Sequence, residues 1–305
     1  MLLYKGGNIN LIGNVQDIFD KVEKNKAFTF SHYTTYGLGG GAKCAFFPKN
    51  LLEARAVYST LKEREQPFTI LGNGSNVLAS DDGFDGYVIC TSKMRGIIRI
   101  DGGTIFCLSG TTVGQLMRYC ITHGLGGLEY LAGIPASVGG LACMNGGAGG
   151  KYISSNIVSV NVFDGTERNL SNKSCKFAYK QSTMRNINCL ILGVFLSVFA
   201  DLPANVSNLT RFYLSRRSSL PKGRSCGCVF KNPPGLSAGM LIEQCGLAGY
   251  GTRRAYVSPR HCNFIINDGA SANEIKRIID DVKNIVYNEL QIRLEEEVVF
   301  VGRFT

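Results

Sequence analysis

A glycine-rich segment between residues 124 and 150 constrains this chain more than any other part of its sequence. It contains ten glycines in 27 residues and a single charge, Glu129. Glycine loses more backbone freedom on folding than any other residue, so this density indicates close backbone approach or positive φ angles. The interleaved Leu, Ile, Val and Met distinguish the segment from a polar linker. It predicts either a backbone-lined cradle for an anionic cofactor or tight turns inside an ordinary sheet.

The composition is that of a globular protein with room for two domains or three small ones. The chain has 305 residues, of which 45% are hydrophobic and 18% charged. No apolar run is long enough to span a bilayer, and residues 1–8 lack signal-peptide architecture because a lysine and two glycines interrupt them. The 11 cysteines are scattered through apolar contexts. That pattern indicates free thiols in a cytoplasmic protein rather than a disulfide framework.

The basic residues are concentrated in one acid-free stretch. The formal net charge is +10, which suits nucleic acid, an acidic membrane surface or a phosphorylated small molecule. Few aromatic residues interleave with these charges, so a phosphate-bearing ligand fits at least as well as a nucleic-acid backbone. Residues 202–242 contain no Asp or Glu but hold Arg211, Arg216, Arg217, Lys222, Arg224 and Lys231.

Hydrophobic periodicity predicts mixed helices and strands without regular βαβ alternation, and therefore an α+β fold. Gly124 is expected to stop the second helix, and Ser271 with Glu274 to cap the third. The polar residues 201–222 indicate a domain boundary. The expected helices cover residues 51–66, 112–122 and 272–290, and the expected strands 67–71, 86–90, 96–100, 104–108, 157–163, 188–199 and 298–301.

The familiar nucleotide and metal motifs are absent. Val77 stands where a dinucleotide fingerprint starting at Gly72 requires glycine, and Asn145 and Tyr152 break a phosphate-loop pattern. Two glycine-rich turns after separate strands could still form a diphosphate nest from backbone N–H groups. No Cys-x-x-Cys occurs, so no metal is expected, and His261 is predicted to be a structural hydrogen-bonding residue.

Two further residues have both a structural and a chemical interpretation. Cys228 is either a buried structural cysteine or a reactive one whose thiolate Arg224 and Lys231 would favour. Glu297 ends an acidic run that is either solvated or supplies a general acid or base at the start of a strand.

Taken in order, the motifs resemble the UDP-N-acetylenolpyruvoylglucosamine reductase (MurB) family, in its shorter form. Any one motif is weak, but the ordered set covers nearly the whole chain from about residue 30. The matching segments are 34–40, 71–76, 127–135, 138–140, 144–148, 177–182, 226–233, 238–243 and 294–298 followed by Gly302.

The resemblance implies a vanillyl-alcohol-oxidase-type FAD-binding region followed by a smaller α+β substrate-binding domain. The implied divisions are residues 1–200, with subdomains of about 1–80 and 81–200, then 201–298, and a C-terminal strand at 299–305. The implied reaction reduces the enolpyruvyl group of a UDP-sugar to UDP-N-acetylmuramate for peptidoglycan synthesis. FAD is the implied cofactor and NADPH the hydride donor.

The resemblance also implies roles for individual residues. Cys228 falls where the family has its proton donor, usually Ser, Lys180 falls where an Arg is usual, and Glu297 falls on the catalytic glutamate. Implied substrate contacts are Tyr179, Arg217, Lys231 and Asn232. Implied FAD contacts are Gly72, Asn73, Gly74, Ser75, Asn76, Gly133, Ile134, Pro135, Ser137, Gly139, Gly140, Asn145, Gly147 and Ala148.

The chain departs from the family pattern at several positions, and rival functions stay open. Lys180 keeps the charge of Arg but loses its planar fork, and a thiol at Cys228 is a stronger acid than an alcohol but sensitive to oxidants. Met240 and Gly149 replace a common basic and a common aromatic residue, and either Lys180 or Arg185 could face the substrate. The rivals are an FAD oxidase with another substrate and a basic nucleic-acid-binding protein. A monomer or weak homodimer without membrane contact is expected.

Overall fold

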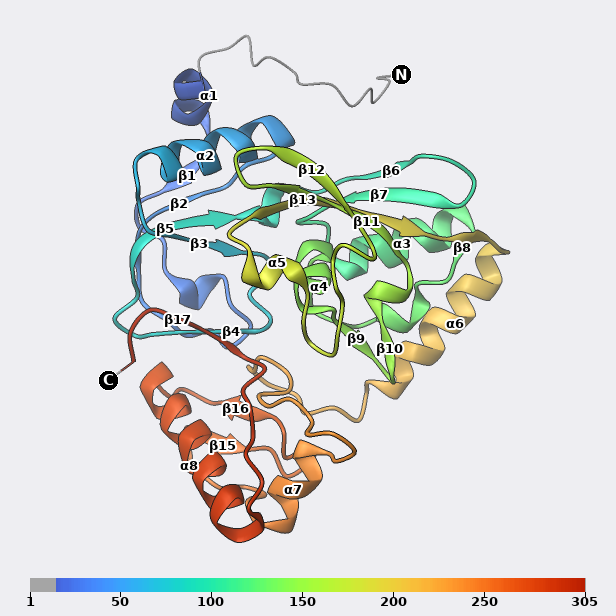
Figure 1. Ribbon diagram of the computed structural model, residues 1–305. Coiled ribbons are helices and arrows are strands. Elements are labelled where there is room, and N and C mark those ends of the chain that lie inside the picture. Colours follow the sequence, from blue (N-terminus) through green and yellow to red (C-terminus); the bar gives the residue numbers. More distant parts are fainter. Residues whose placement is uncertain (1–14, 305) are drawn as a thin grey trace.

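The computed structural model describes residues 15–304 (Figure 1). The expectation about residues 1–8 lies outside this range. Within it, no helix is long and apolar enough to cross a bilayer. Several separate hydrophobic clusters form the interior, two of them on the two faces of the first sheet. The fold is α+β, as the sequence predicts.

The first sheet has four strands in the order β1 (Lys24–Asn25), β2 (Ala42–Phe46), β5 (Phe84–Cys90) and β3 (Phe68–Leu71). Strands β2 and β3 both run parallel to β5. Helix α2 (Leu51–Glu63) packs on this sheet, and the Asn50 side chain caps it by accepting a hydrogen bond from the Glu53 N–H. Helix α1 (Val15–Lys21) lies against α2.

The second sheet has five antiparallel strands in the order β12 (Glu167–Ser171), β11 (Ile157–Phe163), β13 (Leu190–Ser197), β7 (Thr104–Leu108) and β6 (Ile97–Arg99). Its inner face forms a core with α3 (Val113–His123) and α4 (Val138–Met144), and α6 (Pro203–Arg216) packs on α3. Gly124 ends α3 at φ +59°, as expected.

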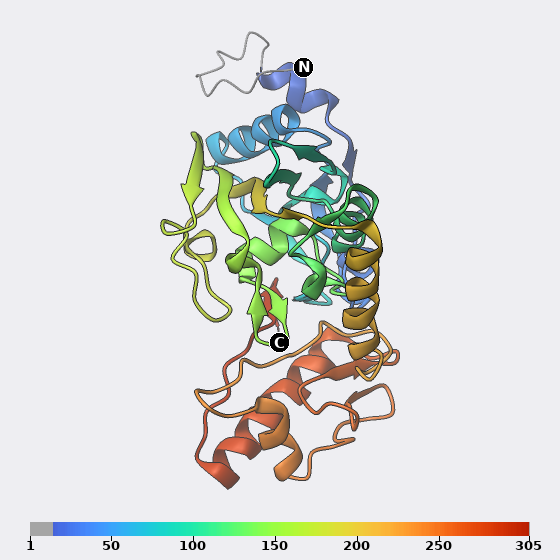
Figure 2. The same cartoon turned by 90° about the vertical axis from the view of Figure 1, so that its right-hand side faces the viewer.

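A smaller core is formed mostly by residues beyond 225, joined by Tyr36, Leu38 and Leu78, and its helices make up the lower lobe in Figure 2. Helices α7 (Ala238–Gln244) and α8 (Ala272–Leu290) pack there with the hairpin of β15 (Ala255–Val257) and β16 (Ile265–Asn267). The apolar stripe of α8 is buried, and the Ser271 side chain accepts a hydrogen bond from the Glu274 N–H at 3.1 Å.

The two lobes are joined by more than a linker. After the smaller core, β17 (Val299–Val301) returns and pairs in parallel with β4 (Val77–Ala79), which follows the 72–76 turn (Figure 1). Both Asp81 carboxylate oxygens accept hydrogen bonds from the first N–H groups of α8, at Ala272 and Asn273. The start of α8 is therefore held against the turn that follows β4, and β17 lies beside β4 itself.

The predicted elements are confirmed within a few residues, and one further long helix was not predicted. Residues 201–222, expected to be a polar boundary, contain the helix α6, which begins with Pro203 at its first turn. Only Val206 and Thr210 of this helix are buried, which explains why its hydrophobic pattern was weak. The shorter elements are β8 (Leu125–Gly126), β9 (Gly147–Ala148), β10 (Lys151–Tyr152), β14 (Phe199–Ala200), α5 (Thr183–Asn186) and four 3₁₀ turns at Phe30–His32, Thr91–Lys93, Glu129–Leu131 and Ile153–Ser155.

Candidate functional site

The two glycine-rich turns of the sequence lie against each other. The Asn73 side-chain amide donates a hydrogen bond of 2.7 Å to the Pro135 carbonyl. A Cβ placed on Gly72 would lie 2.6 Å from the Ser137 hydroxyl oxygen. At Gly74, where φ is +62°, a Cβ would lie 2.1 Å from the Tyr33 carbonyl oxygen. Residues 72–76 and 133–140 thus form one pair of facing loops, which meet through the Asn73 and Ser137 side chains and which we call the glycine loops.

The rest of the glycine-rich segment is not a continuous loop. Ser137 caps α4, and Asn145 ends it in the left-handed conformation. A Cβ on Gly139 would lie 2.8 Å from Ser109, and one on Gly147 would lie 1.9 Å from the Lys151 carbonyl oxygen. Close packing within the chain is enough to explain why residues 139 and 147 are glycines. A Cβ on Gly149 or Gly150, by contrast, would meet no atom within 4 Å.

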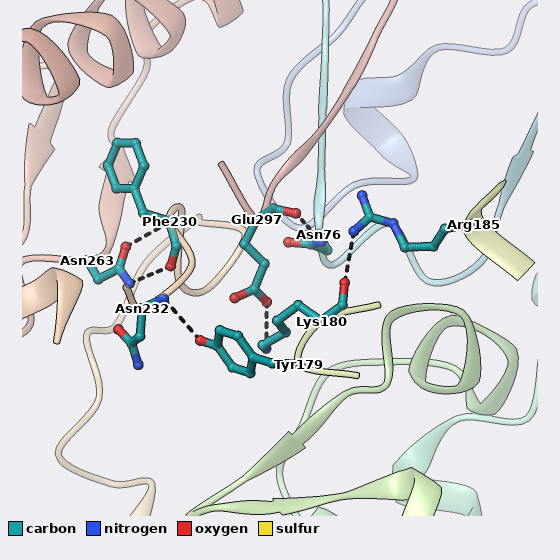
Figure 3. A network of polar contacts seen from close by, with 8 residues as sticks. All are labelled: Asn76, Tyr179, Lys180, Arg185, Phe230, Asn232, Asn263 and Glu297. Carbon is teal, nitrogen blue, oxygen red and sulfur yellow. Dashed lines mark hydrogen bonds and ion pairs between the residues drawn. The ribbon is translucent and has the colours of Figure 1, made fainter. Parts of the chain in front are cut away.

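Beside the glycine loops, Lys180 and Glu297 form an ion pair (Figure 3). The Lys180 ammonium donates to Glu297 Oε1 at 2.6 Å, and only 16% and 11% of the two side chains is exposed. Because burial removes water from both charges, the attraction between them is stronger than that of a surface pair. The structure therefore brings together two of the three predicted catalytic residues.

Backbone contacts place Glu297 next to Cys228. The Glu297 N–H donates to the Val229 carbonyl at 2.7 Å, so the residue after Cys228 is hydrogen-bonded to Glu297. The Glu297 carbonyl in turn accepts a hydrogen bond of 2.9 Å from the Asn76 side chain, which belongs to the first glycine loop. Loop 72–76, Cys228 and Glu297 thus meet although they are far apart in the sequence.

Asn263 holds the segment that carries Cys228. Its side chain accepts from the Phe230 N–H and donates to the Phe230 carbonyl, both at 2.8 Å (Figure 3). Its backbone carbonyl accepts from the Val229 N–H at 2.8 Å. Asn263 is 2% exposed, so these bonds are protected from water. Asn263 was not among the predicted site residues, because a lone Asn carries no spacing signal.

The electrostatics of Cys228 differ from the sequence expectation. Burial, followed by repulsion from the Glu297 carboxylate, raises the pKa of the Cys228 thiol to about 11, and Lys180 and Arg217 only partly oppose this. The expectation that Arg224 and Lys231 favour its thiolate is therefore wrong. Arg224 instead packs over Gly37. At neutral pH Cys228 is a protonated thiol, which is slow to react with oxidants.

Lys180 and Glu297 also have shifted pKa values. Burial disfavours the carboxylate and raises the pKa of Glu297, although attraction to Lys180 opposes that shift. For Lys180, burial lowers the pKa, but attraction to Glu297 and the hydrogen bond to it outweigh burial, so the pKa is raised. The ammonium of Lys180 therefore persists in a buried position.

Of the two candidate cations, Lys180 is the one that points to Glu297. Arg185 on α5 contacts the other end of the same residue, where its Nη1 donates to the Lys180 carbonyl at 2.9 Å (Figure 3). Lys180 has φ +55°, a left-handed conformation that is unusual for lysine and costs about 1–3 kcal/mol. Such strain is typical of functional sites.

The predicted substrate residues surround this centre. The Tyr179 hydroxyl accepts a hydrogen bond from the Asn232 N–H at 3.1 Å, and the Asn232 side chain accepts one from the Ala238 N–H at 3.0 Å. Lys231 pairs with the exposed Glu295 at 3.0 Å. Arg217 lies over the second glycine loop, since a Cβ on Gly133 would be 3.0 Å from its Cδ.

The remaining expectations concern Met240, which replaces a common basic residue of the family, His261 and metal binding. Met240 is 70% exposed on α7. His261 accepts a hydrogen bond from the Asn263 N–H at 3.3 Å, and burial lowers the pKa of its imidazole, as expected for a structural histidine. In residues 15–304, no group of three or more His, Cys, Asp or Glu is arranged to hold a metal ion.

The chain matches two protein families along its length. Residues 42–170 match the family described as "FAD binding domain", and residues 219–301 match "UDP-N-acetylenolpyruvoylglucosamine reductase, C-terminal domain". The first includes both glycine loops, and the second includes Cys228 and Glu297.

Whole proteins with the same name are similar over most of their length. The UDP-N-acetylenolpyruvoylglucosamine reductase of Synechococcus sp. (strain JA-3-3Ab) is 38% identical over 280 residues, covering 89% of each chain. That of Chlamydia abortus is 36% identical, covering 87% of this chain and 90% of its own. The crystal structure of the reductase (MurB) from Thermus caldophilus superimposes with a TM-score of 0.78 at 31% identity, covering 92% of this chain and 99% of that one.

Proposed function

The chain belongs to the UDP-N-acetylenolpyruvoylglucosamine reductase family, and on that premise we propose that Lys180, Cys228 and Glu297 are its catalytic residues. The observation that carries the proposal is the meeting of the Lys180–Glu297 ion pair with the Cys228 segment at the first glycine loop.

The enzyme reduces the enolpyruvyl group of UDP-N-acetylglucosamine enolpyruvate to give UDP-N-acetylmuramate, a precursor of peptidoglycan. Bound FAD would supply the redox chemistry, by which hydride from NADPH reaches the substrate. The protein must therefore bind the UDP-sugar, stabilise the charge that develops on it and supply a proton.

The glycine loops fit a flavin dinucleotide. Gly72 lies against the Ser137 hydroxyl and Gly74, at φ +62°, lies against the Tyr33 carbonyl, so neither position has room for a side chain. Backbone N–H groups in such loops suit a diphosphate. The residues proposed to hold FAD are Gly72, Asn73, Gly74, Ser75, Asn76, Gly133, Ile134, Pro135, Ser137, Gly139, Gly140, Asn145, Gly147 and Ala148.

Lys180 is proposed to stabilise the substrate anion. Addition of hydride to the enolpyruvyl double bond places negative charge next to the substrate carboxylate. A fixed ammonium in a water-poor site stabilises that charge without reorganisation. Glu297 keeps Lys180 charged and oriented through the 2.6 Å ion pair. The Glu297 carboxylate also polarises the enolpyruvyl group of the substrate.

Cys228 is proposed to donate the proton that completes the reduction. Its raised pKa keeps the thiol protonated at neutral pH, and Lys180 and Arg217 stabilise the thiolate left after transfer. The thiolate then regains its proton from solvent. The substrate gains one hydride on one carbon and one proton on the other, so the reaction balances.

The substrate itself is proposed to contact Tyr179, Arg217, Lys231 and Asn232. Arg217 lies over the second glycine loop, and its charge acts on the Cys228 thiol. Burial lowers the pKa of its guanidinium, so a bound anion would stabilise the charged form. A UDP diphosphate is such an anion.

We propose the domain division at residue 201, with residues 1–200 for FAD, 201–298 for the substrate and 299–305 as a returning strand. The basic stretch then serves a UDP-sugar and not nucleic acid or a membrane, and the protein is a monomer or weak homodimer. A cytoplasmic location agrees with its 11 free cysteines, all of which lie in the described residues.

The direct test is NADPH oxidation with and without UDP-N-acetylglucosamine enolpyruvate. We expect yellow protein and NADPH turnover that depends on the UDP-sugar. Turnover with oxygen alone would support an oxidase with another substrate. A colourless protein with salt-dependent binding to nucleic acid would contradict the proposal.

A further inference from the structure

The backbone of Lys180 is held in a conformation that it would not adopt unaided. Residues 178–181 form a turn in which the Ala178 and Gln181 N–H groups donate to each other's carbonyls at 3.1 and 3.2 Å. Lys180 is the third residue of this turn and has φ +55°. Gly or Asn is usual at a turn position with positive φ, so a lysine here depends on contacts from outside the turn.

Two side chains hold the carbonyls of this turn. The Asn145 amide donates to the Ala178 carbonyl, and Arg185 Nη1 donates to the Lys180 carbonyl, both at 2.9 Å. Arg185 reaches it from α5, whose start is fixed by a 2.6 Å hydrogen bond from the Ser182 hydroxyl to the Cys143 carbonyl. Arg185, which donates to the Lys180 carbonyl, is thus anchored to α4 through Ser182.

Figure 3 shows that Arg185 and Glu297 contact opposite ends of Lys180. Arg185 binds the backbone carbonyl, whereas Glu297 binds the ammonium. An ammonium on a flexible stem lacks the planar fork by which a guanidinium orients itself on a carboxylate. The direction of the Lys180 side chain therefore depends more on its backbone than that of an arginine would.

We propose that Arg185 is a positioning residue for the reaction, because it holds the turn that presents the Lys180 ammonium to Glu297 and the substrate. The inference rests on the proposed role of Lys180. Arg185 does not touch the reacting atoms in this account, and its charge also favours the carboxylate form of Glu297.

The first test compares Arg185→Met with Arg185→Lys in the FAD-loaded enzyme. We expect Arg185→Met to lower kcat about 10- to 100-fold, with KM for the UDP-sugar changed less, because the cation is misplaced rather than lost. Arg185→Lys should recover much of the loss, since an ammonium can still donate to the carbonyl. The matched control is Arg99→Met, which removes an exposed arginine whose Nε donates to the Asp101 carbonyl at 3.1 Å, far from the site.

A double-mutant cycle with Lys180→Met separates positioning from direct action. If Arg185 acts through Lys180, adding Arg185→Met to Lys180→Met should lower kcat by less than about twofold. If the two kcat losses were additive, or if Arg185→Met had the same kcat as Arg99→Met, the role of Arg185 would be overturned while the proposed role of Lys180 would stand. An unimpaired Lys180→Met enzyme would overturn the proposed role of Lys180 and this inference with it. Should Arg185→Met fold poorly, judged by FAD content, Arg185→Gln takes its place in the same cycle.

Discussion

The glycine loops and the catalytic centre are neighbours, but they are built in opposite ways. The loops at 72–76 and 133–140 pack closely at Gly72 and Gly74, where there is no room for a side chain. The centre at Lys180, Cys228 and Glu297 depends on side-chain charge and protonation. A change that adds one carbon should damage the first and spare the second, whereas an isosteric change of charge should do the reverse.

The largest effect is expected from Glu297→Gln. This change keeps the shape but removes the partner of Lys180, so turnover should fall about 10³-fold. Stopped-flow absorbance should show that NADPH still bleaches the flavin while reoxidation by the UDP-sugar becomes slow. Glu295→Gln, at a side chain that is 74% exposed, is the matched control. Loss of FAD from the Glu297→Gln protein would show that Glu297 is structural and would remove the contrast.

Cys228→Ala should have the next largest effect, a loss of about 10²-fold in kcat, since it removes the proposed proton donor. Cys228→Ser should retain substantial turnover because a hydroxyl can also donate a proton. Steady-state kinetics measures kcat of both variants and of wild type, and FAD content is measured in parallel. Equal activity of the alanine and wild-type enzymes would exclude Cys228 as the donor.

Gly74→Ala tests the backbone-built side of the comparison. Its Cβ would lie 2.1 Å from the Tyr33 carbonyl oxygen at a residue with φ +62°. We expect a loss of about 3 kcal/mol in stability and weaker FAD retention. Thermal unfolding and the ratio of flavin to protein absorbance measure both. Gly102→Ala, where a Cβ meets nothing within 4 Å, should leave both unchanged.

The smallest effect concerns pH. The pKa of Cys228 is about 11 in the folded protein, above its ordinary value of 9.0. The folded state therefore keeps a proton that the unfolded state has lost, and stability falls as pH rises from about 9 towards 11. Urea unfolding of wild type and Cys228→Ser should diverge over this window by no more than about 2 kcal/mol, with wild type losing more. A pH-independent difference would contradict the burial of the thiol.

Much of the fold could be read from local patterns. Helix α8 shows its cap and apolar stripe directly, and the strands at 104–108 and 157–163 are bounded by clear turns. Helix α6 was missed because it buries too little apolar surface to produce a periodic signal. Propensity and pattern thus identify elements that bury one full face.

The site was harder to predict from the sequence than the fold. Its residues were named through a family resemblance, whereas their contacts depend on tertiary structure. The thiolate expectation for Cys228 failed because sequence neighbours such as Lys231 do not determine which charges a buried group meets. Asn263 and Arg185 act through backbone carbonyls, and such contacts leave no spacing pattern in a single sequence.

The pairing of β17 with β4 determines when, during synthesis of the chain, the catalytic centre can assemble. Synthesis proceeds from the N-terminus, so β4 leaves the ribosome long before residues 299–301, its only strand partner among the described residues. Until then Asn76 cannot reach the Glu297 carbonyl. The nascent chain can form both larger sheets early, but it can assemble its catalytic centre only after Glu297 and the strand that follows it have been translated.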